Sequence, residues 1–241
     1  MAIYTSKTKI DLEDVGYSNK ITNKAILKIL ENAGARQSET IHFGLNDMEN
    51  VGFSWILLGW KVKILKRPIY NEELTINTWG RDSNRIFTYR DYEIYDESGE
   101  LCTIATSKWA IVDINTGRLR ELTPEIIEKY QCETKKVFKE DYTLKLKEPA
   151  TIIRKQEYKA QRRDIDINKH IHNLYYLDYA YEVLPEEVYE APECNNIEIM
   201  YKKQIRLNDE FKCLYTKEKN QNIVTMKSED ENTLHAIIKL Y

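Results

Sequence analysis

Apolar and polar residues alternate, or β-branched and aromatic residues cluster, in eight short runs of the chain. Neighbouring side chains of a strand point to opposite faces, so a two-residue period is typical of a strand that is buried on one face. Turn-forming residues separate the runs and favour hairpins between them. The runs cover residues 53–65, 73–82, 85–96 and 101–113 in the first half, and 195–206, 210–219, 222–229 and 233–241 in the second.

Two other segments carry apolar residues at helical spacing, which predicts one amphipathic helix over residues 22–37 and another over residues 173–184. Thr22 can cap the first helix, and Gly34 stands where that helix would fray or stop. Pro185 follows the second helix. The apolar positions are Ala25, Ile26, Ile29, Leu30 and Ala33 in the first segment, and Leu174, Leu177, Ala180, Tyr181 and Leu184 in the second.

The two halves repeat one order of elements. Extended pieces at residues 3–10 and 151–161 precede the two helices, and four strands follow each helix. A single helix must bury its apolar stripe against one face of a sheet, so we expect an α+β fold in which each sheet wraps one helix. The predicted organisation is a first domain over residues 1–130, a charged linker over 131–149 and a second domain over 150–241.

Composition narrows the class of protein. Apolar residues make up 42% and charged residues 31% of the chain, and the net charge is −3, so the sequence gives no reason to expect a nucleic acid partner. The N-terminus lacks the apolar core of a secretory signal, and the most apolar run is too short to span a bilayer, which predicts a cytoplasmic protein that is not in a membrane. The four cysteines form no CxxC pair and are expected to be reduced thiols.

Candidate chemistry gathers in RRDIDINKHIHNLYY, residues 162–176, which holds two of the four histidines. In an extended chain every second side chain shares a face. That face would hold Asp164, Asp166, Asn168, His170 and His172, and the opposite, core-facing side would hold Ile165, Ile167 and Ile171. We expect the following helix to begin at about Leu174, with Asn173 or His172 as its cap, so that its free N–H groups could stabilise an oxyanion.

Three interpretations of this cluster stay open on spacing alone. A carboxylate, a carboxamide and an imidazole can together activate water and orient a carbonyl group. His-x-His with an aspartate could instead bind zinc, although Asn168 is a poor ligand and no cysteine is near. In the third interpretation the cluster is a solvated turn whose aspartates pair with Arg162 and Arg163.

Several stretches resemble the acyl-acyl carrier protein (acyl-ACP) thioesterases of bacteria and plant plastids. They are residues 55–79, residues 85–122 with their ATSKW and NTGRL segments, and residues 164–185, so the resemblance covers nearly the whole chain. It implies a tandem, or double, hotdog fold that hydrolyses fatty acyl thioesters of an acyl carrier protein without a cofactor or metal. The Asp-x-Asn-x-His segment of that family falls on Asp166, Asn168 and His170.

The resemblance also implies a role for each residue of the site. Asp166 would activate water or attack the carbonyl carbon, and Asn168 would hold the carbonyl or the water. His170 would assist proton transfer to the departing thiol or keep Asp166 oriented. N–H groups near Asn173 and Leu174 would bind the oxyanion.

One position departs from the family pattern. Where the family often has a glutamate after an aromatic and two basic residues, this chain has Gln204 in YKKQI. A glutamine can position water but cannot act as a base. If the register differs by a few residues, Glu198 is the alternative acid. The matching region of the first half, DLEDVGYSNK, has Asp14 but no Asp-x-Asn-x-His spacing, so we expect one active site, in the second half, and an acyl tunnel shaped by the first.

The expected partner is an acidic acyl carrier protein, which requires a basic docking surface. Three groups are candidates: Arg162 with Arg163, Lys202 with Lys203, and Lys61, Lys63, Lys66 and Arg67. Three other functions remain open, namely an acyl-coenzyme A thioesterase, a non-catalytic acyl-binding hotdog protein and, less favoured, a hotdog dehydratase. A homodimer is also compatible with the sequence.

Overall fold

The protein is described by a computed structural model, which covers residues 3–81, 84–140, 145–192 and 194–241. The chain divides into two compact units, Met1–Thr143 and Leu144–Tyr241, and each is described by itself. Residue 82 of the second predicted strand and residues 141–144 of the predicted linker lie outside the described residues.

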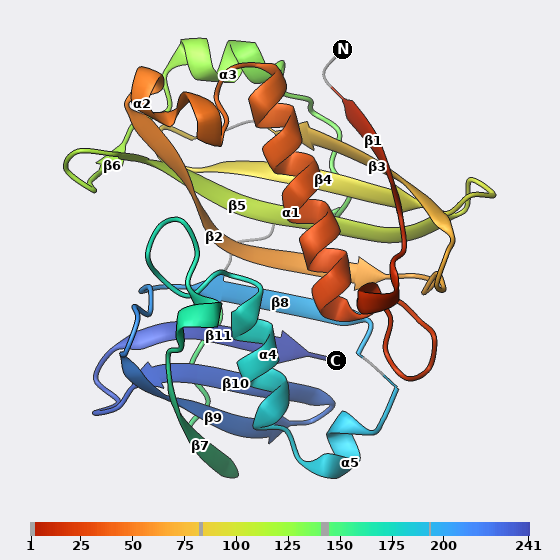
Figure 1. Ribbon diagram of the computed structural model, residues 1–241, viewed down its shortest axis with the longest axis vertical. Coiled ribbons are helices and arrows are strands. Elements are labelled where there is room, and N and C mark those ends of the chain that lie inside the picture. The colour runs from red at the N-terminus through yellow and green to blue at the C-terminus, as the bar shows by residue number, and fades with distance from the viewer. Residues whose placement is uncertain (1–2, 82–83, 141–144, 193) are drawn as a thin grey trace. The chain divides into compact units, whose positions relative to one another are not determined.

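The first unit is a twisted antiparallel sheet with one long helix, α1 (Asn23–Thr40), on one face (Figure 1). The strands follow the spatial order β1-β3-β4-β5-β2, and a short β6 pairs with β5. Two further helices are α2 (Met48–Val51) and α3 (Pro124–Tyr130). The strands are β1 (Tyr4–Lys9), β2 (Phe53–Ile64), β3 (Glu73–Gly80), β4 (Thr88–Tyr95), β5 (Leu101–Asp113) and β6 (Leu119–Arg120).

The second unit repeats this arrangement with a shorter helix, α4 (Tyr175–Glu182), lying on its sheet (Figure 1). Its strands follow the order β7-β9-β10-β11-β8, which matches the order in the first unit strand for strand. The helix α5 (Glu186–Tyr189) follows α4. The strands are β7 (Arg154–Lys159), β8 (Asn196–Tyr201), β9 (Glu210–Glu218), β10 (Gln221–Ser228) and β11 (Leu234–Leu240). The predicted α+β duplication is therefore confirmed.

The apolar positions that defined the helices and strands form the two cores. In both units the helix buries its apolar stripe against residues that face it from the sheet, as a single helix on a sheet requires. Fully buried side chains include Ile26, Leu30, Trp60, Ile76 and Tyr92 in the first unit, and Leu177, Ile199, Phe211, Val224 and Ile237 in the second.

The helix α1 does not stop at Gly34, so that prediction was wrong. It continues to Thr40, and Gly34 is buried. A Cβ atom at Gly34 would lie 2.9 Å from the Tyr92 hydroxyl oxygen and 3.2 Å from Cδ of Arg90. The glycine is therefore explained by the close approach of α1 to β4, and a pattern of residue types along the helix does not contain that information.

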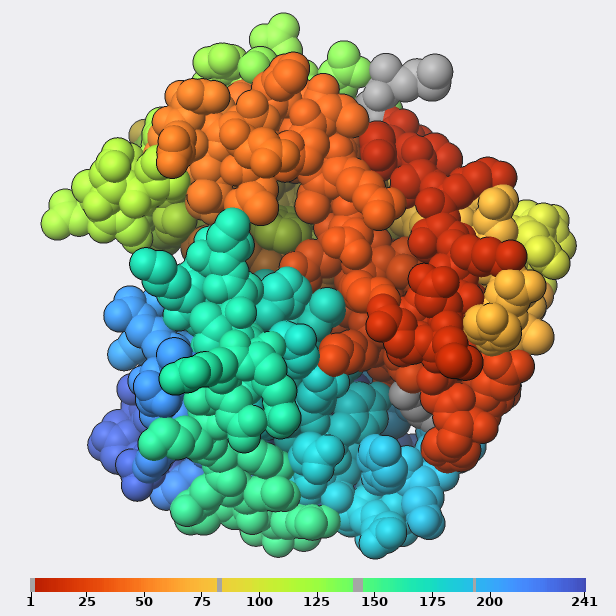
Figure 2. Space-filling model, viewed as in Figure 1, coloured from red at the N-terminus to blue at the C-terminus, as the bar shows by residue number. Residues whose placement is uncertain are grey.

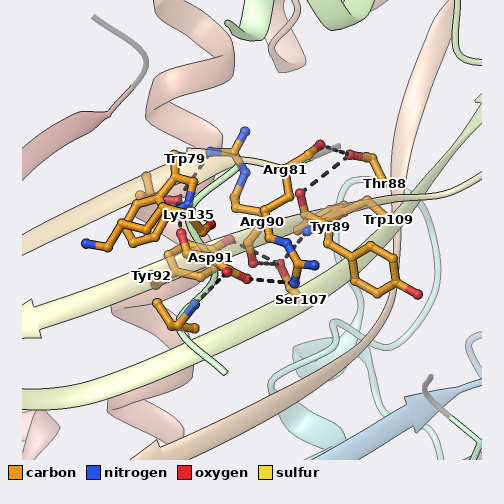
Figure 3. A network of polar contacts seen from close by, with 12 residues as sticks. Trp79, Arg81, Thr88, Tyr89, Arg90, Asp91, Tyr92, Ser107, Trp109 and Lys135 are labelled. Carbon is orange, nitrogen blue, oxygen red and sulfur yellow. Dashed lines mark hydrogen bonds and ion pairs between the residues drawn. The ribbon is translucent and has the colours of Figure 1, made fainter. Parts of the chain in front are cut away.

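The space between α1 and the first sheet contains buried polar groups, among them Arg90, which is labelled in Figure 3. Arg90 on β4 donates to the side chain of Gln37 on α1 and to Thr78 Oγ1 at 3.3 Å, and its guanidinium carbon lies 5.3 Å from the centre of the Tyr130 ring. Ser38 and Tyr130 share a hydrogen bond of 2.7 Å. A buried cation of this kind is tolerated only because hydrogen-bond acceptors and an aromatic ring surround it.

Residues 133–138 lie along the first sheet instead of leaving it. The backbone N–H of Glu133 donates to Gly80 O at 2.9 Å, Trp79 Nε1 donates to Lys135 O at 3.0 Å, and Val137 N–H donates to Asp91 Oδ2 at 3.0 Å. Asp91 is fully buried, and this burial raises the pKa of its carboxyl group. The start of the predicted linker is thus held to the first unit by hydrogen bonds.

Among the helices of the described residues, none has the length and apolarity needed to cross a membrane.

Candidate active site

The polar cluster of the second unit forms a tight turn. Ile165 and Ile171 face each other in an antiparallel bridge, Asp166 N–H donates to His170 O at 2.9 Å, and Lys169 N–H donates to Asp166 O at 3.0 Å. Lys169 closes the turn with a φ of 64°, in the left-handed region. The chain around residue 168 therefore reverses direction.

The prediction of an extended segment with one polar and one core face was wrong. Ile167, expected in the core, is at the tip of the turn and is 70% exposed, whereas Ile171 is fully buried as expected. So short a run of alternating polar and apolar residues does not distinguish an extended strand from a chain that folds back on itself through two hydrogen bonds. The segment around this turn lies at the surface of the face shown in Figure 2, where it is coloured teal.

The turn brings the side chains of Asp166 and His170 together, with the backbone of Asn168 beside them and its side chain exposed. Asp166 Oδ1 accepts a hydrogen bond of 2.8 Å from the Asn168 N–H, and His170 Nδ1 lies 3.7 Å from the same oxygen. His170 Nδ1 is also 3.3 Å from the Ile171 carbonyl oxygen. A proton on Nδ1 can be donated to that carbonyl, which leaves Nε2 as the nitrogen available for proton transfer. The side chains of Asp166 and His170 are 13% and 23% exposed, so both are partly covered yet reached by solvent.

Asp164 does not share the position of these three residues. Its side chain is buried, and Oδ2 accepts hydrogen bonds from the Tyr179 hydroxyl at 2.6 Å and from Gln161 N–H at 2.9 Å. Its carbonyl oxygen accepts from His172 N–H at 2.9 Å. Burial, followed by the Asp164 carboxylate, raises the pKa of Tyr179. Asp164 is therefore a buried anchor for both ends of the turn, and Arg163 approaches it only at 3.7 Å.

The helix α4 begins at Tyr175, one residue after the predicted start. His172 provides the bonds ahead of it, because His172 Nδ1 accepts from Leu174 N–H at 3.3 Å and His172 O accepts from Tyr175 N–H at 2.9 Å. The Leu174 N–H, predicted as an oxyanion donor, is thus engaged by His172. Asn173 O accepts from the Tyr201 hydroxyl at 3.1 Å.

Gln204 belongs to a segment that runs beside the turn. Ile171 N–H donates to Ile205 O at 2.8 Å, and His170 forms a bridge with Arg206. With its amide oxygen turned toward Arg206, the Gln204 side chain accepts hydrogen bonds of 3.1 Å and 3.3 Å from Nη2 and Nε of the guanidinium. Glu198, the alternative acid, lies on β8 and accepts from the Tyr241 hydroxyl at 2.8 Å.

The first unit contains the same turn without the same side chains. Gly16 N–H donates to Lys20 O at 3.0 Å, Asn19 N–H donates to Gly16 O at 2.9 Å, and Val15 and Ile21 form the bridge. Asn19 has a φ of 57°, as Lys169 has 64° in the second unit. When the two turns are matched by these equivalent hydrogen bonds, Gly16, Ser18 and Lys20 correspond to Asp166, Asn168 and His170.

The same correspondence matches Asp14 to the buried anchor Asp164. Asp11 N–H donates to Asp14 Oδ2 at 3.1 Å, as Gln161 N–H donates to Asp164, and Thr22 N–H donates to Asp14 O at 2.9 Å. The aspartate that both halves have in common is therefore a structural residue. Asp14 and Asp164 stand at the same place in the two segments, and this shared position is the signal in the sequence for their structural role.

Neither metal nor cysteine chemistry finds support among the described residues. In the part of the chain that the structure describes, no three His, Cys, Asp or Glu side chains are placed to bind a metal ion together. All four cysteines are free thiols, and burial raises the pKa of Cys102 to about 11 and the pKa of Cys213 as well. High thiol pKa values make Cys102 and Cys213 poor nucleophiles.

The sequence matches the two domains of one enzyme family along almost its whole length. The acyl-ACP thioesterase N-terminal domain matches residues 1–130, and the acyl-ACP thioesterase C-terminal domain matches residues 147–239. Oleoyl-acyl carrier protein thioesterase 2 of Arabidopsis thaliana is 25% identical over 238 residues, which are 92% of this chain and 65% of that protein. The oleoyl-acyl carrier protein thioesterase of Coriandrum sativum is 25% identical over 244 residues, or 93% of this chain and 65% of its own. The chain thus spans somewhat less than two thirds of the length of these relatives.

Solved structures share the fold. An acyl-ACP thioesterase from Bacteroides thetaiotaomicron superposes with a TM-score of 0.87 at 21% identity and covers 99% of this chain and 97% of its own. The 12:0-ACP thioesterase from Umbellularia californica gives a TM-score of 0.87 at 17% identity, with 100% and 96% covered. The predicted double hotdog fold is confirmed by these matches, and with both domain descriptions matched in order, the chain belongs to the acyl-ACP thioesterase family.

Proposed function

We propose that the protein hydrolyses the thioester of a fatty acyl group carried on the phosphopantetheine arm of an acyl carrier protein. The observation that carries this proposal is the turn that gathers Asp166, Asn168 and His170, while the same turn in the first unit has Gly16, Ser18 and Lys20. The backbone is repeated, and only the second copy has a carboxylate, a carboxamide and an imidazole. Membership of the family supports the assignment of this copy as the active site.

In the proposed reaction water adds to the carbonyl carbon, the carbon–sulfur bond breaks, and the products are a fatty acid and the free thiol of the arm. Asp166 activates the water or attacks the carbonyl itself, which would make a mixed anhydride that water then cleaves. Among the described residues no hydrogen bond reaches Asp166 Oδ2, so that oxygen is free to meet water or substrate.

Asn168 and His170 complete the chemistry. The exposed carboxamide of Asn168 holds the carbonyl or the water. His170 accepts a proton at Nε2 from the water and passes it to the departing sulfur. Because the Leu174 N–H is engaged by His172, oxyanion stabilisation falls to the Asn168 carboxamide and the backbone near Asn173. Gln204 is held by Arg206 and, with no acid at this position, positions water without acting as a base.

The contacts favour the second unit as the docking surface for an acidic carrier protein. Arg162, Arg163, Lys202 and Lys203 are all exposed. In the first unit Lys66 is paired with Asp96 at 2.7 Å and Glu100 at 2.5 Å, and Arg67 donates to Ile21 O at 2.9 Å. Cations that already have partners contribute less to the attraction of another acidic surface.

The test is to measure the release of free thiol from acyl-ACP and acyl-coenzyme A substrates of matched chain length. The Asp166→Ala variant serves as the negative control. We expect turnover of the carrier-bound substrates at a higher kcat/KM. A preference for acyl-coenzyme A would favour the coenzyme A thioesterase. Binding of both substrates without turnover would favour the acyl-binding protein, in which Gln204 marks lost activity.

Two further predictions from the sequence, a cytoplasmic location and a homodimer, stay predictions. Light scattering on the purified chain over a range of concentrations would test the second.

A further inference from the structure

A hollow of about 490 Å³ opens on the surface of the second unit between the end of β8 and the start of β9. Its lining residues are all exposed. They lie next to the catalytic turn, because Arg206 is bridged to His170 and Ile205 O accepts from Ile171 N–H at 2.8 Å. The lining consists of Lys202, Lys203, Gln204, Arg206 and Asp209.

The charge of this hollow is positive. Its three cations and one carboxylate give a net charge of +2. In the part of the chain that the structure describes, no carboxylate forms an ion pair with Lys202, Lys203 or Arg206. By contrast, Lys212 on β9 lies 3.6 Å from Glu157 and 3.7 Å from Glu231. Several unpaired cations around one concave surface attract an anionic ligand.

Gln204 contributes to this charge by being neutral. Its amide oxygen accepts two hydrogen bonds from Arg206 and so orients the guanidinium without cancelling its charge. A glutamate in the same place would form an ion pair with Arg206 and would lower the net charge of the hollow to +1. Besides removing an acid, glutamine at position 204 therefore keeps the hollow more positively charged than glutamate would.

The backbone beneath the lysines is fixed. Lys202 N–H donates to His235 O at 2.8 Å, and His235 Nδ1 lies 2.8 Å from Lys203 O. His235 is buried on β11. Two contacts to a buried strand hold the segment in place, so an anion bound there would meet groups that are already positioned.

We propose that this hollow binds the phosphate of a 4′-phosphopantetheine group whose thioester lies at the catalytic turn. The inference rests on the proposed function and adds to it a subsite for the arm. Two amide groups and their methylene spacers separate the phosphate of the arm from its sulfur. Arg206 is bridged to His170, and Lys202 lies within ~14 Å of Arg206 along extended chain, so the hollow is within reach of an arm whose thioester lies at this turn. Acyl carrier protein and coenzyme A share this chemistry.

The test compares three thioesters of one acyl group: acyl-ACP, acyl-coenzyme A and acyl-pantetheine, which lacks the phosphate. The variants are Lys202→Ala with Lys203→Ala, and Gln204→Glu. We expect the double variant to raise KM about tenfold for both phosphate-bearing substrates, and Gln204→Glu to raise it several-fold, with little change for acyl-pantetheine. The control is Lys147→Ala with Lys217→Ala, which removes two exposed lysines elsewhere in the second unit.

Three outcomes would overturn the subsite. An equal rise in KM for acyl-pantetheine would show that the lysines act without the phosphate. A rise confined to acyl-ACP would show that they contact the carrier protein and not the arm. No rise with any substrate would leave the hollow without a role in binding.

A wild type that cleaves none of the three thioesters would contradict the proposed function itself. Calorimetry with 4′-phosphopantetheine and with pantetheine then decides the subsite alone. Tighter binding of the phosphate-bearing compound, lost in the double variant, supports it, and equal binding of the two compounds overturns it.

Discussion

The hydroxyl of Tyr179 on α4 donates a hydrogen bond of 2.6 Å to the buried carboxylate of Asp164, two residues before Asp166. In the first unit the matching aspartate, Asp14, is instead approached by Lys28 Nζ at 2.5 Å. The two copies of the turn are therefore anchored by different chemistry. In the copy with the candidate catalytic residues, the anchor is a neutral donor that adds no positive charge beside Asp166.

We expect Tyr179→Phe to destabilise the protein by about 1–3 kcal/mol, because it removes a donor from a buried carboxylate. The turn that carries Asp166 and His170 would lose one of its fixed points, so kcat should fall more than KM changes. Urea unfolding and steady-state kinetics measure the two effects.

The control for this prediction is Tyr158→Phe. The Tyr158 ring packs 5.0 Å from the Tyr179 ring, yet its buried hydroxyl has no hydrogen-bond partner among the described residues. Removing that hydroxyl should leave stability unchanged or slightly higher. Equal losses in the two variants would mean that the Tyr179 bond to Asp164 does not anchor the turn.

Gly34→Ala should destabilise the first unit although alanine is the better helix former. The intrinsic gain in a helix is about 1 kcal/mol. The new Cβ would meet the Tyr92 hydroxyl at 2.9 Å, and Tyr92 is fully buried. Overpacking of this kind typically costs about 1–3 kcal/mol, so the clash should outweigh the gain. Thermal unfolding of the purified variant gives the answer.

The same substitution in a Tyr92→Phe background isolates the cause. Without the hydroxyl oxygen the closest contact disappears, and the cost of Gly34→Ala should shrink. A cost that is the same in both backgrounds would assign the effect to Arg90, whose Cδ lies 3.2 Å from the position of the new Cβ.

Stability should decline as the pH falls below about 6.5, in part through His235. Burial lowers the pKa of His235 beneath its usual value of about 6.5. Below that pH the unfolded chain binds a proton that the folded protein does not, so the free energy of unfolding decreases until the folded pKa is passed. Above about pH 6.5 this contribution is fully present.

His235→Asn tests this assignment, because its amide nitrogen can still donate to Lys203 O but does not titrate. The free energy of unfolding of this variant should depend less on pH between about 7 and 5 than that of the wild type. Parallel curves for the two proteins would exclude His235 as a source of acid sensitivity.

Much of the fold could be predicted from the sequence because local pattern and final environment agree. Burial alternates along β1 and along most of β3, and Thr22 Oγ1 caps α1 by accepting a hydrogen bond of 3.1 Å from Ala25 N–H. The end of α1 could not be predicted, because Gly34 is required by its close approach to Tyr92, a residue far along the chain.

The candidate site was predictable in its residue types and not in its shape. Asp166, Asn168 and His170 stand out by spacing, but the turn depends on the left-handed conformation of Lys169 and on two backbone bonds. The hydrogen bonds between Gln204 and Arg206 and the ion pair between Lys66 and Asp96 depend on how the folded chain brings these side chains together. No periodicity encodes such pairs.

The most direct test of the account is the single-turnover rate of thiol release from acyl-ACP by Asp166→Asn, measured beside the wild type and Lys20→Ala. Lys20 occupies in the first unit the position that His170 has in the second, so its substitution changes the equivalent turn without touching the proposed chemistry. We expect a loss of about 10²–10⁴-fold for Asp166→Asn and a near wild-type rate for Lys20→Ala. A wild-type rate in Asp166→Asn would contradict the assignment of the second turn as the active site.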